Sequence, residues 1–127
     1  MATSGNVVFP LYDGCTLLDF AGATQVFAFG GFTPIWVAPT CDPIKTTENV
    51  KVVPGDTFDH VLTQPIEILF VPGGGKKVGG VMLDPVFVDF VREAGGAARW
   101  AGSVCTGAFI LAIDRVAMAT RTRGIWP

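Results

Sequence analysis

Cys105 is the side chain best placed for chemistry in this chain of 127 residues, because it follows a strand-like segment, precedes a helical one and has small neighbours on both sides. Gly102, Ser103, Thr106 and Gly107 allow the tight backbone of a nucleophile elbow, in which free N–H groups of the next helix hold an anion. The N-terminus of that helix also favours the thiolate, the nucleophilic form of cysteine. The pattern predicts a reactive thiol, and a small buried core residue is the alternative interpretation.

Asp19 is the second candidate, within the apolar segment 17–22 at the head of a helical pattern. A carboxyl group that shares a poorly solvated site with a thiolate cannot easily stay charged beside it, so one proton would be held between the two. Asp19 is therefore predicted to act as an acid. The alternative is an ordinary helix N-cap, a common position for aspartate.

The third feature is a glycine loop that follows the apolar run 66–71. Its backbone N–H groups can approach a ligand closely, and we expect Gly74 N–H and Thr106 N–H to form an anion hole. Gly73 and Gly75 are expected to take part in substrate binding. The loop matches neither a P-loop nor a dinucleotide-binding pattern, so phosphate binding is disfavoured.

The remaining cysteines and the single histidine offer no further catalytic group. His60 falls in a predicted surface loop and nothing links it to Cys105, so a Cys–His pair is not supported. Cys15 and Cys41 are expected to be bystanders. Three cysteines without metal-ligand spacing indicate reduced thiols, no disulfide framework and no metal, and the sequence calls for no cofactor.

Composition limits the class of protein. The chain is 50% hydrophobic and 16% charged, with a net charge of -2, so one well-buried core in a single domain over 1–127 is expected. The sequence has no basic patch of the kind that binds nucleic acid. It also has no apolar stretch that approaches the roughly 20 residues needed to span a bilayer. The start lacks a signal peptide, so a cytoplasmic protein that acts on a small molecule is expected.

Strand-like and helical segments alternate along the chain. Most of the strands are continuously apolar, which favours an open, doubly wound parallel sheet with helices on both faces. Ligands bind such sheets beyond the carboxyl ends of the strands, where Asp19, the glycine loop and Cys105 should gather. We expect strands at 6–12, 32–39, 50–54, 66–71 and 99–104, a helix that runs through 23–29 to Gly30 and Gly31, and a helix capped by Asp84 and halted at Gly95 and Gly96.

The chain resembles the PfpI/ThiJ superfamily. The matching pieces are Phe9-Pro10, the segment 18–27, Val71-Pro72-Gly73-Gly74 and Ser103 to Phe109. The resemblance implies a flavodoxin-like fold, like that of type-1 glutamine amidotransferases, and a homodimer. From 113 to 127 the chain departs from the family pattern, and we expect a domain truncated after the elbow helix.

Within this superfamily, many members carry histidine directly after the nucleophile, where this chain has Thr106. The Cys-Thr-Gly elbow and the Leu-Asp-x-x-Gly segment are similar to those of isonitrile (isocyanide) hydratases, a class of lyase. The resemblance implies that Cys105 attacks the isocyanide carbon, that Asp19 donates a proton, and that Gly74 and Thr106 N–H groups stabilise the charge. The ligand-sensing domain of AraC-type transcription regulators is also similar. A redox-responsive thiol protein, with Cys105 oxidised to the sulfinic state, is a further alternative.

Overall fold

The computed structural model describes residues 5–113 of the chain, and this part contains the predicted alternation of strands and helices. None of the helices in this range has the length and apolar character needed to cross a membrane. The elements are, in chain order, β1 (Asn6–Pro10), α1 (Leu17–Phe29), β2 (Thr33–Ala38), β3 (Ile44–Lys45), β4 (Lys51–Val52), β5 (Asp56–Thr57), α2 (Phe58–Val61), β6 (Ile68–Val71), the 3-10 turn η1 (Gly75–Lys77), α3 (Val78–Val81), α4 (Pro85–Ala97), β7 (Trp100–Ser103) and α5 (Gly107–Ile113).

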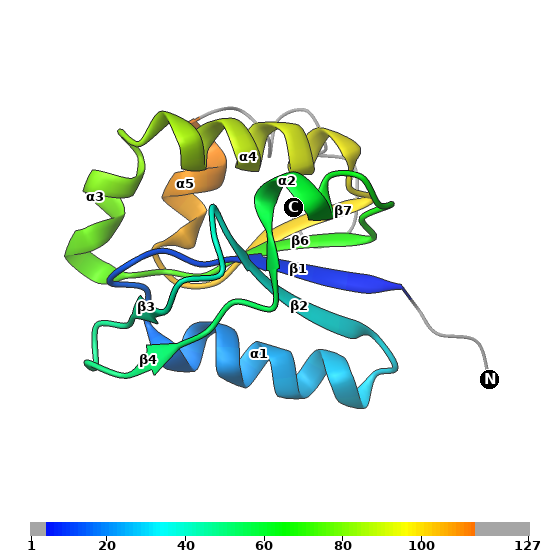
Figure 1. Ribbon diagram of the computed structural model, residues 1–127, viewed down its shortest axis with the longest axis horizontal. Coiled ribbons are helices and arrows are strands. Elements are labelled where there is room, and N and C mark those ends of the chain that lie inside the picture. Colours follow the sequence, from blue (N-terminus) through cyan, green and yellow to red (C-terminus); the bar gives the residue numbers. More distant parts are fainter. Residues whose placement is uncertain (1–4, 114–127) are drawn as a thin grey trace.

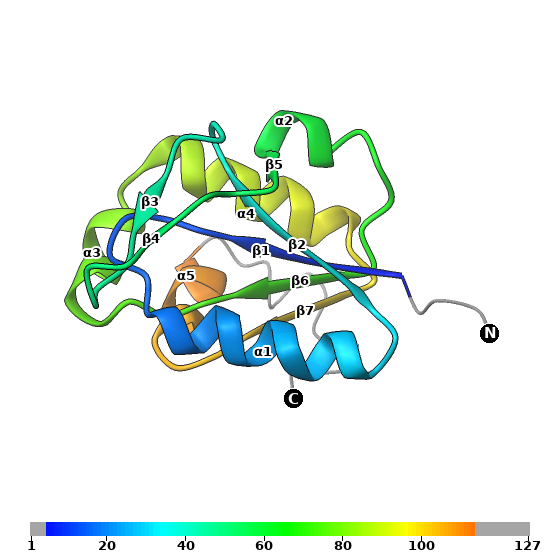
Figure 2. The same cartoon turned by 60° about the horizontal axis from the view of Figure 1, so that its bottom comes forward.

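Five strands form one parallel sheet in the order β5-β2-β1-β6-β7. The chain moves outward from the central β1 to β2 and then returns to the other side of β1 through β6 and β7. Helix α1 covers one face of the sheet, and α2 and α4 cover the other (Figures 1 and 2). The flavodoxin-like, doubly wound architecture is thus confirmed, and β3 and β4 form a separate antiparallel hairpin beside it.

The core lies on both faces of β1, which explains why that strand reads as an unbroken apolar run. Val7, Val8 and Phe9 are fully buried. Phe9 packs edge-on against Phe27 of α1 at 6.2 Å between ring centroids. On the opposite side, α2 and α4 meet through stacked aromatic rings, with the centroids of Phe58 and Phe90 4.0 Å apart. The parallel pairing of β1 with β6 and of β6 with β7 places the carboxyl ends of these three strands next to one another.

Two local predictions were wrong. Gly95 and Gly96 do not halt α4, which continues to Ala97. Ala94 and Gly95 are buried against the core, and tertiary packing of this kind overrides the weak helix propensity of glycine. His60 lies in the short helix α2 rather than in a loop, because Thr57 caps that helix by accepting the His60 N–H at 3.2 Å. The segment from 114 onward, which was expected to depart from the family pattern, lies outside the described residues.

Candidate active site

Cys105 lies at a sharp turn between β7 and α5, and its side chain is exposed. Its φ angle is +54°, in the left-handed region that residues other than glycine rarely adopt. Val104 N–H donates to the Val71 carbonyl at 3.1 Å, which ties the elbow to the end of β6. The predicted elbow is therefore present in the backbone, and the alternative of a buried core cysteine does not describe this position.

Gly107 makes this turn possible because the elbow packs directly on the strand beside it. A β-carbon at Gly107 would overlap the Val71 carbonyl oxygen and lie 3.0 Å from the Pro72 carbonyl carbon. Both are backbone atoms that a side-chain rotation cannot move. The small residue at this position is thus required by the approach of two backbone segments.

Gly107→Ala is expected to lower the free energy of unfolding by about 2–4 kcal/mol, because β6 and the elbow must separate. Chemical denaturation followed by circular dichroism measures this. Gly96→Ala is the matched control, since a β-carbon there meets nothing within 4 Å and alanine favours helix by roughly 0.5–1 kcal/mol. Equal stability of Gly107→Ala and the wild type would contradict the packing described.

Asp19 and the elbow meet at Gly73. Gly73 N–H donates to Asp19 Oδ2 at 3.1 Å. A β-carbon placed on Gly73 would lie 2.9 Å from that same oxygen and 2.9 Å from Thr106 N. The carboxyl group of α1 and the backbone beside Cys105 are thus separated by little more than one glycine. Asp19 does not cap α1, because Thr16 occupies the N-cap position, so the alternative reading of Asp19 is wrong.

The next glycine also contacts the elbow. Gly74 N–H donates to Thr106 Oγ1 at 3.1 Å, so the threonine hydroxyl fastens the glycine loop to the turn. The Thr106 N–H, in contrast, makes no backbone hydrogen bond within residues 5–113. Of the two donors expected to form an anion hole, Thr106 N–H is therefore free in this state and Gly74 N–H is bound to a side chain.

Tyr12, for which no sequence pattern predicted a role, contacts this loop. Its hydroxyl donates to the Pro72 carbonyl at 2.8 Å, and its ring fills the space beside Gly74. Burial raises the pKa of Tyr12 far above its ordinary value, and electrostatic coupling to Cys15, Asp19 and Cys105 in their ionised forms raises it further. Tyr12 therefore stays neutral and holds the loop in place.

Cys15 is fully buried, and burial raises the pKa of its thiol to about 11. Since only the thiolate reacts, iodoacetamide at pH 8 should leave Cys15 unlabelled while Cys41 and Cys105, both exposed, are modified. Peptide mass spectrometry distinguishes the three thiols. Labelling of Cys15 should appear as the pH is raised toward 11, and rapid labelling at pH 8 would contradict its burial.

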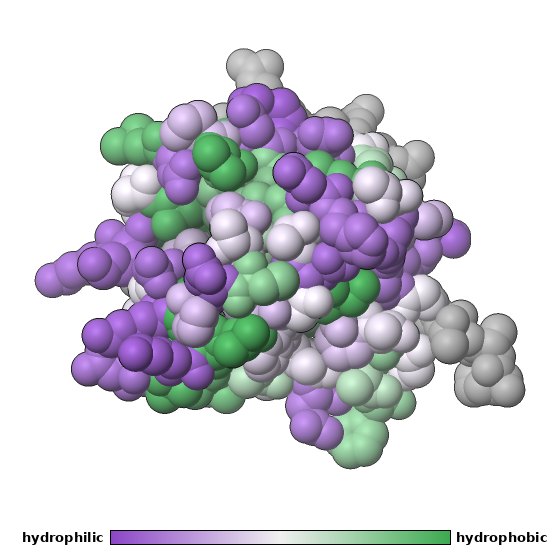
Figure 3. All heavy atoms as spheres, in the orientation of Figure 1, coloured by the Kyte–Doolittle hydropathy of each residue, from purple (hydrophilic) through white to green (hydrophobic). Residues whose placement is uncertain are grey.

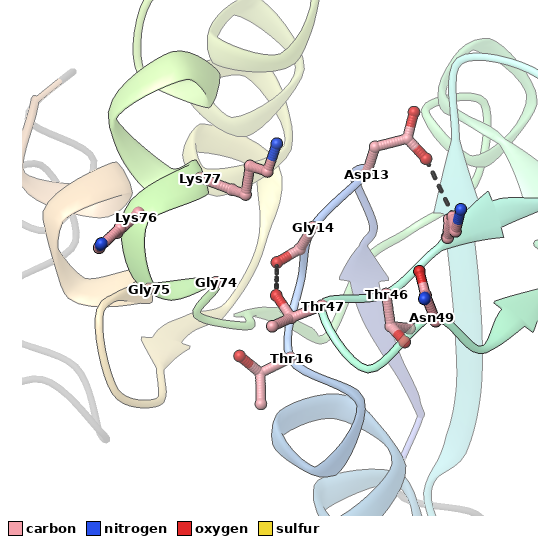
Figure 4. Close-up of a pocket in the computed structure, with 11 residues that line it drawn as sticks. Asp13, Gly14, Thr16, Thr46, Thr47, Asn49, Gly74, Gly75, Lys76 and Lys77 are labelled. Carbon is pink, nitrogen blue, oxygen red and sulfur yellow. Dashed lines mark hydrogen bonds between the residues drawn. The ribbon is translucent and has the colours of Figure 1, made fainter.

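A cavity of about 590 Å³ adjoins the glycine loop (Figure 4). One wall is the segment from Gly74 to Lys77, and the other is the β3–β4 hairpin with Thr46 and Asn49. Neither Cys105 nor Asp19 lines it. The cavity therefore adjoins the candidate site through Gly74, whose N–H donates to Thr106 Oγ1 next to Cys105.

The other candidate groups lie away from the site. His60 is exposed at the far edge of the sheet, where its Nδ1 lies 2.8 Å from Asp56 Oδ2 and lowers the pKa of that carboxyl group. Cys41 lies in the exposed loop that follows β2. Within the described residues, no three histidine, cysteine or acidic side chains come together as a metal site.

The parallel sheet, the cysteine elbow and the carboxyl group anchored to a glycine loop define a class of α/β proteins with a nucleophile-elbow site. The chain belongs to the DJ-1/PfpI family, whose pattern it matches over residues 5–127. It is 30% identical over 84 residues to an isonitrile hydratase of Pseudomonas putida, a match that covers 66% of this chain and 36% of the relative. The chain thus spans little more than a third of that relative.

Two further comparisons agree with this assignment. An uncharacterized protein from Streptomyces lividans, from the region 5' of cpoL, is 29% identical over an alignment of 126 residues, and the match covers 95% of this chain and 87% of that protein. The crystal structure of a ThiJ/PfpI family protein from Pseudomonas syringae superposes with a TM-score of 0.79 at 28% identity. That superposition covers 91% of this chain and 48% of the other.

Proposed function

We propose that the chain forms the nucleophilic part of an isonitrile hydratase, which adds water to an isocyanide and releases an N-substituted formamide. The observation that supports this most directly is the convergence of Asp19 Oδ2 and the Thr106 backbone on the β-carbon position of Gly73, next to an exposed thiol at an elbow. A nucleophile and a proton donor that meet at one small residue suit an addition reaction.

In the first step, the Cys105 thiolate attacks the terminal carbon of the isocyanide and forms a carbon–sulfur bond. The carbon receives a proton from the Asp19 carboxyl group, which gives a thioimidate and an ionised Asp19. Gly73 N–H holds Oδ2 at 3.1 Å, which leaves Oδ1 to present the proton. No oxidant or reductant is needed, because only a thiol has added across the isocyanide carbon.

In the second step, water attacks the thioimidate carbon and gives up a proton to Asp19, which restores its acidic form. The imidate nitrogen takes the other proton, and the tetrahedral intermediate collapses by breaking the carbon–sulfur bond. The products are the formamide and the Cys105 thiolate, so one water has been consumed. The free Thr106 N–H is the donor that stabilises the negative charge developing in these steps.

Formamide production from an aryl isocyanide in ¹⁸O-labelled water tests the proposal. The expected result is steady turnover, with the label in the formyl oxygen and a transient mass increase on the Cys105 peptide equal to one isocyanide. Cys41→Ala serves as the control, because it removes an exposed thiol outside the site. Turnover without any adduct on Cys105 would reject the covalent route, and no turnover would reject the function.

We also infer that the protein is a cytoplasmic homodimer. Free thiols at Cys15, Cys41 and Cys105 suit a reducing compartment. For the dimer, the support is an apolar stripe on α1, where Leu18, Val26 and Phe29 are 70–83% exposed on one side of the helix. Gly22 lies within this stripe and would let the α1 helices of two copies approach closely.

Phe29→Glu is expected to convert the dimer to a monomer, because a charge would be buried between the two helices. Sedimentation velocity measures the change. Ala28→Glu adds the same charge to the same helix at an exposed position beside the stripe, and it should leave the dimer intact. A wild-type protein that sediments as a monomer would contradict the homodimer.

A further inference from the structure

Three lysines line the cavity beside the glycine loop, and they come from two separate segments. Lys45 belongs to β3, while Lys76 and Lys77 belong to η1. Among the described residues, none of the three lies within ion-pair distance of a carboxylate. Hydrophilic side chains cover this side of the molecule around the β3–β4 hairpin and the η1 region (Figure 3). The wall of the cavity therefore carries positively charged side chains that form no ion pairs with the described carboxylates.

The acidic groups near the cavity serve the backbone instead. Asp13, the acidic residue of its lining, accepts the Lys45 N–H at 3.0 Å and so fixes the hairpin to the end of β1. Glu48 accepts the Leu17 N–H at 3.0 Å at the start of α1. With these two carboxylates counted, the three ammonium groups still leave one unmatched positive charge.

The cavity shares its boundary with the candidate active site. Gly74, whose N–H is bound to Thr106, lines the cavity. Thr16 lines it too, and the Thr16 N–H donates to the Gly73 carbonyl at 2.8 Å. Gly74 thus belongs to the cavity wall, and Gly73, which anchors Asp19, is tied to that wall through Thr16. Cys105 directly precedes Thr106, whose Oγ1 accepts the Gly74 N–H, so the cavity wall is joined to the backbone of the elbow.

We propose that this cavity binds a carboxylate on the substituent of the substrate, so that isocyanides bearing a carboxylate are preferred over neutral ones. The inference rests on the proposed function and adds the substrate class to it. A volume of about 590 Å³ holds a small organic acid, in line with ligand pockets of about 300–1,000 Å³. Lysine, with a compact charge on a flexible stem, suits a carboxylate held at a partly open surface.

Turnover of 4-isocyanobenzoate and of its methyl ester measures the preference directly. The wild type should show a lower KM for the carboxylate, and Lys45→Gln and Lys77→Gln should each raise that KM about threefold without changing KM for the ester. Lys45→Arg and Lys77→Arg keep the charge and should retain the preference. Lys51→Gln removes a lysine from the same hairpin whose side chain does not line the cavity, and it should leave the preference unchanged.

A second measurement does not require hydratase activity. The ratio of Cys105 alkylation by iodoacetate to that by iodoacetamide reports whether the lysines attract a carboxylate toward the thiol. This ratio should fall about threefold in Lys45→Gln/Lys77→Gln at low salt and should lose its dependence on the variant at 1 M salt. Cys41, exposed in another loop, gives the reference ratio within the same sample.

The two measurements separate the two ideas. Hydration of the ester with no preference for the carboxylate, and no change in the alkylation ratio, would overturn the anion site while leaving the hydratase function in place. An alkylation ratio that depends on Lys45 and Lys77, in a protein that hydrates neither isocyanide, supports the anion site and rejects the hydratase. If Lys51→Gln changed the preference for the carboxylate as much as Lys45→Gln does, the effect would come from the overall positive potential of the surface, and the proposed anion site would be overturned.

Discussion

Cys105→Ala should lower the rate of isocyanide hydration by at least about 10³-fold, which corresponds to roughly 4 kcal/mol of lost transition-state stabilisation. The reason is that the carbon–sulfur bond cannot form, and water attacks a free isocyanide far more slowly than it attacks a thioimidate. The measurement is kcat/KM for an aryl isocyanide, followed by the appearance of the formamide.

The control for this experiment is Cys41→Ala, which should keep the wild-type rate. Alanine at position 105 replaces an exposed side chain, so the denaturation midpoint of Cys105→Ala should stay close to that of the wild type. A higher midpoint would indicate that the left-handed backbone at this position has relaxed. Equal hydration rates for Cys105→Ala and the wild type would remove the hydratase proposal. A loss of folding in this variant would be visible in the denaturation curve and would be separated from chemistry by that curve.

Asp19→Asn should lower turnover by about 10²–10³-fold, the usual contribution of a positioned acid. Asparagine retains an oxygen that can accept the Gly73 N–H, so the glycine loop should keep its place. Asp19→Ala removes both the proton donor and this acceptor. Comparison of the two variants therefore separates proton transfer from the anchoring of the loop.

The decisive readout for Asp19 is a pair of rates measured on the same protein. In Asp19→Asn, alkylation of Cys105 by iodoacetamide should stay within about twofold of the wild type, because the elbow is intact, while formamide production falls. Full activity in Asp19→Asn, with a decline only in Asp19→Ala, would mean that the carboxyl group serves only to hold Gly73.

The sequence allowed the scaffold to be predicted because its strands and helices are signalled locally. Helix α4 shows this most clearly, with Asp84 as the cap and Pro85 as the first residue, as expected. The short strands β3 and β5 were missed, since two-residue strands have no periodicity and are formed by their partners. The same holds for the end of α4, which packing extends beyond two glycines.

For the candidate site, the sequence indicated the elbow, the acid and the glycine loop, because small residues that follow a strand-like segment form a pattern that can be recognised in the sequence itself. It gave no sign of Tyr12, whose contact with Pro72 spans 60 positions. It also could not show that the Gly74 N–H is taken by Thr106 Oγ1, since a hydroxyl at that position can point several ways. Contacts between distant segments that depend on one rotamer are not encoded in a local pattern.

The β3–β4 hairpin has a consequence for how this protein could diversify. It supplies Lys45, Thr46 and Asn49 to the cavity wall, whereas its large side chains at the core are Ile44, which is buried, and Val52, which is partly buried. In the proposed function, exchange of this hairpin for one of another length or charge would change which molecules are accepted, because the hairpin forms one wall of the cavity. The hairpin side of the proposed binding cavity and the reacting Cys105 thus belong to different segments of the chain, so the first can evolve while the second stays fixed.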